Sequence, residues 1–131
     1  MKFDENSKIL IVGLGLIGGT YARALTEKGY EVGGIDVDEK AIEYALSKGW
    51  IKSGQTQVDK EYVGKFDVIV FAVYPHVFID WIEKYQSFIK NGALVTDVTG
   101  VKGSVVYKVQ ELLRSDVEFV GAHPMAGREV S

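Results

Sequence analysis

The sequence predicts an α/β fold in three layers, with a doubly wound parallel β-sheet between two layers of helices. Two observations predict it: short apolar runs alternate with segments of helical periodicity, and a glycine-rich turn joins the first run to the first helix. Nearly continuous apolar runs are typical of strands that are buried on both faces of a parallel sheet. Right-handed crossovers between such strands place helices on both faces. We therefore expect one domain spanning residues 1–131.

The predicted strands are rich in β-branched residues and end at glycine or polar residues. The expected positions are residues 9–12, 30–35, 68–73, 93–96 and 117–120, with a sixth strand around 50–52. Gly33 and Gly34 interrupt the run at 30–35. Glycine inside a strand indicates the close approach of a helix or of a bound ligand.

Helical periodicity fills the intervals between the predicted strands. Helices are expected over 17–28 (stopped by Gly29), from an N-cap at Asp38 to Gly49, over 76–90 and over 101–114. Aromatic residues recur at helical spacing in 76–90, and we interpret them as packing against the sheet. The polar segment 53–65 predicts a short helix or an excursion.

Composition and charge exclude several classes of protein. The net charge of −3 removes the electrostatic basis for non-specific nucleic-acid binding. The absence of cysteine excludes a disulfide framework and a thiolate metal site, and no metal site is expected. The apolar runs are too short to span a bilayer, and the N-terminus has no signal-peptide pattern. A cytoplasmic protein without membrane or nucleic-acid partners is expected.

The glycine-rich turn is the most informative motif. It has the pattern G-x-G-x-x-G, with the sequence Gly13-Leu14-Gly15-Leu16-Ile17-Gly18, directly after a predicted strand. Gly13 permits the tight turn, Gly15 lets the backbone approach a pyrophosphate, and Gly18 allows close packing of helix on strand. The free amides of the first helical turn then face the phosphates. This context predicts a Rossmann-type dinucleotide-binding domain.

Asp36 predicts which dinucleotide binds. It ends the second predicted strand, about 20 residues after the glycine motif. An acidic residue at that position binds the adenosine ribose in dinucleotide-binding domains. A carboxylate there accepts from the 2′-hydroxyl and repels a 2′-phosphate, so NAD is expected rather than NADP. The alternative is that Asp36 only caps the following helix, a role for which Asp38 is better placed.

Further candidate residues follow the other predicted strands, because ligands bind beyond the carboxyl ends of the strands in such sheets. Cofactor contacts are expected from Val73, Tyr74, Pro75 and Asp97, and contacts to nicotinamide or substrate from Thr99 and Gly100. Alternatively, Tyr74 packs on the sheet edge and Asp97 and Thr99 only cap a helix. His76 is expected to be solvated rather than catalytic.

His123 is the strongest catalytic candidate, because it follows the last predicted strand in a glycine-rich loop stiffened by Pro124. A histidine with a near-neutral pKa is a suitable base for an alcohol whose hydride leaves for NAD+. The alternative is a buried histidine whose nitrogens bond to backbone.

Three motifs together resemble the cofactor domain of the prephenate dehydrogenase family, which includes arogenate dehydrogenases. They are GLGLIGGT at 13–20, DVTGVKG at 97–103 and GAHPMAGRE at 121–129. The resemblance implies NAD-dependent oxidative decarboxylation of prephenate to 4-hydroxyphenylpyruvate in tyrosine biosynthesis. His123 matches the catalytic histidine. Gly100 stands where many members have a serine.

The resemblance also implies a second, helical domain that forms a homodimer and holds the substrate carboxylates. The sequence ends at Ser131, and only Arg128 follows His123 as a cation. We therefore expect this chain to bind NAD but to convert prephenate poorly or not at all. Alternatives are a 3-hydroxyacid or arogenate dehydrogenase, or a non-catalytic NAD-sensing regulatory domain.

Overall fold

The expected three-layer α/β architecture is confirmed by a computed structural model that describes residues 4–100 and 102–121. Over these residues six parallel strands form one sheet in the order β3-β2-β1-β4-β5-β6. The strands are β1 Lys8–Val12, β2 Glu31–Ile35, β3 Ser53–Gln55, β4 Val68–Phe71, β5 Leu94–Asp97 and β6 Glu118–Gly121. The helices are α1 Leu16–Glu27, α2 Glu39–Ser47, α3 Lys60–Val63, α4 Pro75–Tyr85, the 3₁₀ turn η1 Gln86–Phe88 and α5 Gly103–Leu112.

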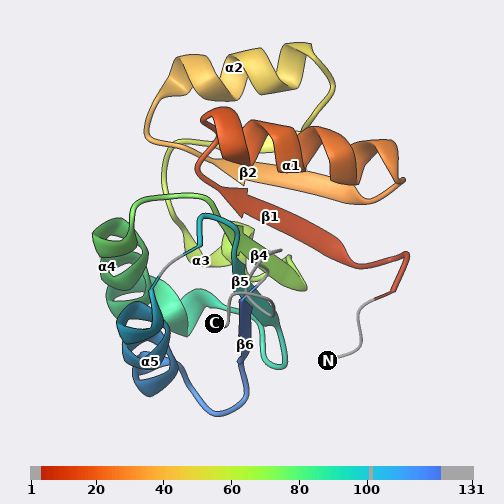
Figure 1. Ribbon diagram of the computed structural model, residues 1–131. Helices are drawn as coiled ribbons and strands as arrows, with labels where there is room; N and C mark the ends of the chain where they lie inside the picture. The colour runs from red at the N-terminus through yellow and green to blue at the C-terminus, as the bar shows by residue number, and fades with distance from the viewer. Residues whose placement is uncertain (1–3, 101, 122–131) are drawn as a thin grey trace.

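The helices cover opposite faces of the sheet, with α1 and α2 on one side and α4 and α5 on the other (Figure 1). Successive side chains of β1 point to opposite faces, which divides the core into two clusters. Ile9 and Ile11 belong to the cluster beneath α1 and α2, whereas Leu10 and Val12 belong to the cluster beneath α4 and α5. Both faces of β1 are therefore buried, which explains its uninterrupted apolar sequence.

The predicted sixth strand at 50–52 is wrong by about three residues. The strand is β3, Ser53–Gln55, which pairs with β2 in parallel. Ile51 precedes this strand, and its side chain is buried in the core. β3 lies at the sheet edge, where a strand need not be apolar. Its side chains are polar, so they lack the apolar pattern by which the other strands were predicted.

The two glycines of β2 make room for neighbouring side chains, as predicted. A Cβ on Gly33 would lie 2.5 Å from Phe66 Cζ and 2.6 Å from the hydroxyl oxygen of Tyr62, a residue of α3. A Cβ on Gly34 would lie 2.8 Å from Leu14 Cδ1. Both glycines therefore serve packing, the first against α3 and the second against the glycine-rich turn.

The predicted helix at 76–90 ends earlier, at Tyr85, and continues as η1. Contacts with the end of α5 explain the change. The side-chain amide of Gln86 donates to the carbonyl of Leu112 and accepts from the backbone N–H of Arg114. The Arg114 guanidinium in turn donates to the carbonyls of Gln86 and Ile89. These bonds come from residues distant in sequence, so the local periodicity contains no sign of them.

Asp67 ties three strands together at their amino ends, the edge opposite the glycine-rich turn. Its side chain accepts from the backbone N–H of Lys8 at 2.9 Å and from the ammonium of Lys90. Its backbone carbonyl accepts from Leu94. Partial burial acts to raise the pKa of Asp67, but the hydrogen bonds and charges of Lys90 and Lys8 outweigh it and lower the pKa.

Asp67→Asn is expected to lower the free energy of unfolding by about 1 kcal/mol at pH 7, because charge-assisted bonds are lost. A lowered folded pKa stabilises the fold above the unfolded pKa of about 3.9, and the contribution is lost as the pH falls through the folded pKa. The difference between Asp67→Asn and the unmodified chain should therefore shrink below about pH 4. Urea unfolding at several pH values measures it. Asp80→Asn, which removes an exposed pair with Lys84, is the matched control and should change little.

Candidate functional site

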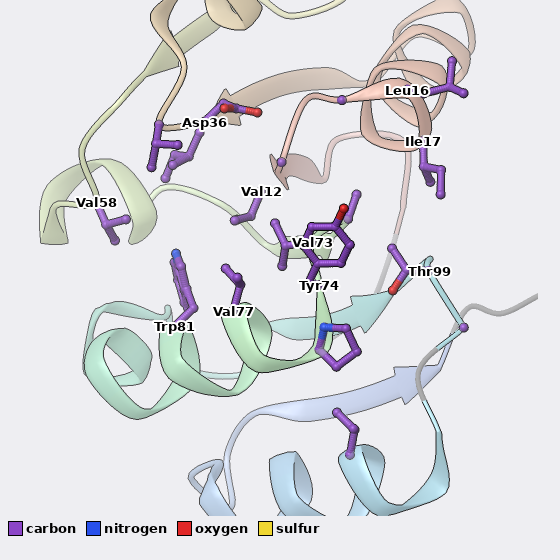
Figure 2. Close-up of a pocket in the computed structure, with 18 of the residues that line it drawn as sticks. Val12, Leu16, Ile17, Asp36, Val58, Val73, Tyr74, Val77, Trp81 and Thr99 are labelled. Atoms are coloured by element: carbon purple, nitrogen blue, oxygen red, sulfur yellow. The ribbon is translucent and has the colours of Figure 1, made fainter.

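A cavity of about 1040 Å³ runs along the carboxyl ends of the central strands. Four segments line most of it: the glycine-rich turn after β1, the end of β2, the connection from β4 into α4 and the connection from β5 into α5. Figure 2 shows Leu16, Ile17, Asp36, Tyr74 and Thr99 around it. Parallel sheets bind ligands at this edge, and the volume suits a ligand larger than a single ring system.

The three motif glycines have three separate structural reasons, and those of Gly13 and Gly18 match their predicted roles. Gly13 has φ +99°, and a Cβ there would lie 2.5 Å from the carbonyl oxygen of Ala72. A Cβ on Gly18 would lie 1.7 Å from the carbonyl oxygen of Gly13, so the helix can approach the strand only without a side chain. A Cβ on Gly15 would meet nothing within 4 Å. Only Gly15 therefore leaves open space, and this space belongs to the cavity.

The first turn of α1 is available to a ligand. Gly15 is the N-cap residue, and no side chain caps this helix in the part of the chain that the structure describes. Leu16 and Ile17, at the start of the helix, line the cavity and are exposed by 89% and 45%. Because these two apolar side chains are adjacent and line the cavity, a ligand bound there would cover them.

Asp36 lines the cavity and also holds the glycine-rich turn. One carboxylate oxygen accepts from the backbone N–H of Leu14 at 2.7 Å, and the other accepts from the N–H of Asp38 at 2.8 Å. Asp38 itself caps α2 by accepting from Lys40, as predicted. Each carboxylate oxygen of Asp36 has a further lone pair, so the residue can position the turn and accept from a ribose hydroxyl as well.

Three of the predicted cofactor residues do not line the cavity. Leu14 is buried beneath the turn, Gly18 packs against Gly13, and Asp97 is 1% exposed at the end of β5. The Asp97 carboxylate accepts from the hydroxyl of Thr99 at 2.8 Å and from the N–H of Gly100 at 3.0 Å. These residues shape the site from below. Gly18 does so through the helix–strand packing predicted for it, whereas the positions of Leu14 and Asp97 do not match direct contact with the cofactor.

Thr99 and Gly100 line the cavity at the exit of β5, as expected for residues that orient a ligand. Gly100 has φ +77°, in the left-handed region that favours glycine. A serine with this backbone conformation would be strained. The glycine in place of a serine is therefore consistent with a turn that Asp97 pins through its side chain.

The connection after β4 places the remaining predicted residues at the cavity. Val73, Tyr74 and Pro75 all line it, and Pro75 is the first residue of α4. Tyr74 is 75% exposed, and its ring stacks on that of His76 with a centroid distance of 6.1 Å. The exposed position of Tyr74 argues against the alternative that it packs on the sheet edge. His76 is exposed, as predicted.

Sequence reasoning missed one end of the cavity. Thr56 and Val58, after β3, and Val77 and Trp81, on α4, also form its wall. Thr56 and Val58 were missed because the sixth strand was predicted about three residues too early, at 50–52. Val77 and Trp81 lie one helical turn apart, so that spacing was a usable signal, but we interpreted the aromatic stripe as packing alone. Trp81 does pack on Phe71, and it reaches the cavity as well.

Two residues that the sequence analysis singled out, His123 and Arg128, lie outside the described residues. Over the described residues, no group of three or more His, Cys, Asp or Glu side chains could hold a metal ion. The helices of the described ranges include none that is long and apolar enough to cross a membrane.

Asp36→Asn tests the predicted preference for NAD+ over NADP+, which the substitution is expected to reduce. Loss of a charged acceptor for the ribose should weaken NAD+ binding by roughly 10- to 100-fold, while NADP+ escapes a repulsive charge. Calorimetric titration with both dinucleotides measures the ratio. The matched control is Asp38→Asn, whose carboxylate is near in sequence but outside the cavity lining. Tighter binding of NADP+ than NAD+ by the unmodified chain would contradict this role.

Comparison with known proteins identifies the family. The family model described as "Prephenate dehydrogenase, nucleotide-binding domain" matches residues 21–131. This chain belongs to that family. The match includes both of the later motifs, 97–103 and 121–129, on which the resemblance rests.

Individual relatives agree with this assignment. A prephenate dehydrogenase of Lactococcus lactis is 32% identical over 126 residues, which cover 95% of this chain and 35% of the relative. A crystal structure of prephenate dehydrogenase from A. aeolicus with hydroxyphenyl propionate and NAD+ superposes with a TM-score of 0.78 at 32% identity, covering 94% of this chain and 43% of that chain. The arogenate dehydrogenase structure from Synechocystis gives 0.79 at 26% identity, covering 88% and 40%. The chain thus spans about a third of the length of the curated relatives it matches.

Proposed function

We propose that this chain is the NAD-binding part of an enzyme that oxidatively decarboxylates prephenate to 4-hydroxyphenylpyruvate. The observation that carries the proposal is the position of the cavity. It joins the glycine-rich turn, Asp36 and the exits of β4 and β5 along one sheet edge. The A. aeolicus relative binds NAD+ and an aromatic acid. A site that spans these segments suits a dinucleotide and a small acid placed end to end.

NAD is the cofactor that the family and the site indicate. The family model describes a nucleotide-binding domain, and NAD+ is present in the A. aeolicus relative. The residues of this chain fit the cofactor, because a Cβ on Gly15 would fill space that the cavity leaves open. When bound, NAD+ supplies a hydride acceptor. We propose a preference for NAD+ over NADP+ because the carboxylate of Asp36 would repel a 2′-phosphate.

The residues divide the work of binding between the two ends of the cavity. Gly15 lets the pyrophosphate approach the amides at the start of α1, and Asp36 accepts from the hydroxyls of the adenosine ribose. Tyr74, Thr99 and Gly100 lie beside the nicotinamide, with Asp97 holding the turn in place. These groups orient the ring so that one face is open to substrate.

His123 is the proposed base, by resemblance to the catalytic histidine of the family. It follows the end of β6 by two residues in the sequence. In the proposed step the histidine takes the proton of the ring hydroxyl, and hydride leaves the ring carbon that bears this hydroxyl for the nicotinamide. The ring carboxylate then departs as CO2, and its bonding electrons complete the aromatic ring. Return of the proton from the histidine to the ring oxygen gives 4-hydroxyphenylpyruvate. Aromatisation drives the reaction, so the protein has mainly to orient and deprotonate.

Groups that hold the substrate carboxylates belong, in our proposal, to the helical domain that the family resemblance implies. The relatives are about three times as long as this chain, and their further length is where such groups and the dimer contacts would lie. Arogenate is the second candidate substrate, since the Synechocystis relative is an arogenate dehydrogenase. The two substrates differ at the side chain, away from the ring carbon that is oxidised.

The test joins this chain to the remaining two-thirds of the Lactococcus lactis relative, replacing the matched third. We expect prephenate-dependent NADH formation, followed at 340 nm, from the joined protein and little or none from the chain alone. NAD+ binding by the joined protein controls for folding. A joined protein that binds NAD+ but oxidises neither prephenate nor arogenate contradicts the proposed function. Robust turnover by the chain alone contradicts the proposed division of labour.

A further inference from the structure

Trp81 has a buried polar atom without a partner. The residue is 6% exposed, and its indole nitrogen Nε1 has no hydrogen-bond partner among the described residues. Burying an N–H without an acceptor costs free energy, so native proteins contain few such groups. A ligand that supplies an acceptor would recover that cost.

The indole ring is held in place by its neighbours in the core. It packs edge-to-face on Phe71 at a centroid distance of 5.0 Å and on Tyr85 at 5.4 Å. Buried rings in such contacts keep their orientation, so the direction of the N–H is set before any ligand binds. In Figure 2 the nitrogen of Trp81 lies at the end of the ring away from α4, on the side of Val58.

The position of Trp81 assigns it to one end of the cavity. Val58, Val77 and Trp81 form an apolar wall there, on the side of Asp36. Thr99 lies at the opposite end, beyond Tyr74. A dinucleotide whose adenosine ribose is bound by Asp36 therefore extends its base towards Trp81 and its nicotinamide towards Thr99.

We propose that the Trp81 Nε1–H donates a hydrogen bond to a ring nitrogen of the adenine base, and that Trp81 is a specificity-determining residue of the cofactor site. This inference rests on the proposed binding of NAD+. The apolar wall packs against the base, while the single N–H recognises a heteroaromatic ring rather than a hydrocarbon. Because Nε1 is covered, a side chain of the wall must move for the base to reach it.

The direct test is a nuclear magnetic resonance titration of chain labelled with ¹⁵N at the indole nitrogens. The sequence has two tryptophans, so the Trp50→Phe variant assigns both signals. Saturating NAD+ should move the Trp81 indole proton downfield and leave that of Trp50 in place. ADP-ribose, which contains the adenosine half, should do the same, whereas nicotinamide mononucleotide should not.

An unmoved Trp81 signal at saturating NAD+, or an equal shift with nicotinamide mononucleotide, overturns the assignment. Absence of any NAD+ binding in calorimetry is a separate result that counts against the proposed function itself. Because calorimetry and the indole signal are read independently, the two failures are distinguishable.

Trp81→Phe provides the energetic test, because it keeps an aromatic ring and removes the N–H. We expect the affinities for NAD+ and ADP-ribose to fall together by about three- to tenfold, the range for one neutral hydrogen bond. Trp50→Phe, the matched control outside the cavity lining, should leave both affinities unchanged. Unchanged NAD+ affinity in a folded Trp81→Phe variant also overturns the proposal. If that variant does not fold, the indole titration of the unmodified chain decides.

Discussion

Gly18→Ala is expected to abolish NAD+ binding and to lower the free energy of unfolding by about 3 kcal/mol or more. The added methyl group would lie 1.7 Å from the carbonyl oxygen of Gly13. Neither atom can rotate away, since one is a backbone oxygen and the other is attached directly to the backbone. Relief therefore requires α1 to move off β1, which distorts the turn and opens the core around Ala22. Urea unfolding and calorimetric titration with NAD+ measure the two effects.

Gly15→Ala is the matched partner, because it adds the same methyl group three residues earlier in the same motif. Here the methyl group meets nothing within 4 Å, so stability should change by less than about 1 kcal/mol. It enters the cavity where the pyrophosphate is proposed to lie, so NAD+ affinity should still fall. A Gly18→Ala variant as stable as the unmodified chain would contradict the observed helix–strand contact. A Gly15→Ala variant with full affinity would contradict the proposed pyrophosphate position.

His123→Asn, made in the protein joined to the Lactococcus lactis segment, is expected to lower kcat by about 10²- to 10⁴-fold, the range for loss of a general base. Asparagine keeps a polar side chain of similar size but cannot take a proton at neutral pH. The affinity for NAD+ should stay within twofold, because the proposed cofactor contacts come from other strands. Steady-state kinetics with prephenate and a separate NAD+ titration provide the two readouts.

His76→Asn is the control for this substitution, since His76 is the other histidine of the chain and is exposed beside Tyr74. It should leave kcat within a few-fold of the unmodified value. A joined protein in which His76→Asn loses activity and His123→Asn does not would reverse the assignment of the base.

The sheet and its central strands were predictable because each strand shows its burial in one short segment of the sequence. Residues such as Ile9 to Ile11 are buried on both faces, and that burial requires an apolar sequence. The N-cap at Asp38 and the turn glycines are likewise requirements of backbone geometry, which a sequence displays directly.

The edge strand and the end of α4 could not be predicted in the same way. β3 is defined by hydrogen bonds to β2, and its polar residues Ser53 and Gln55 do not distinguish a strand from a loop. The early end of α4 depends on Gln86 and Arg114, whose contact joins residues 28 positions apart. Such tertiary contacts override local periodicity.

At the site, spacing identified the residues that a ligand would meet but not all of their contacts. Asp36 was predicted to bind ribose, and the structure adds a bond to Leu14 that holds the turn. Asp97 was predicted as a ligand contact, but its buried carboxylate serves Thr99 and Gly100 instead. Trp81 was predicted to pack, and its position at the cavity appears only when α4 is placed beside β4.

Titration of the unmodified chain with NAD+ tests the central claim most directly, because that claim concerns the cavity along the strand ends. Calorimetry is predicted to show saturable binding of one NAD+ per chain, with NADP+ binding more weakly in a parallel titration. Absence of saturable NAD+ binding by the folded chain would contradict the assignment of the cavity as a dinucleotide site.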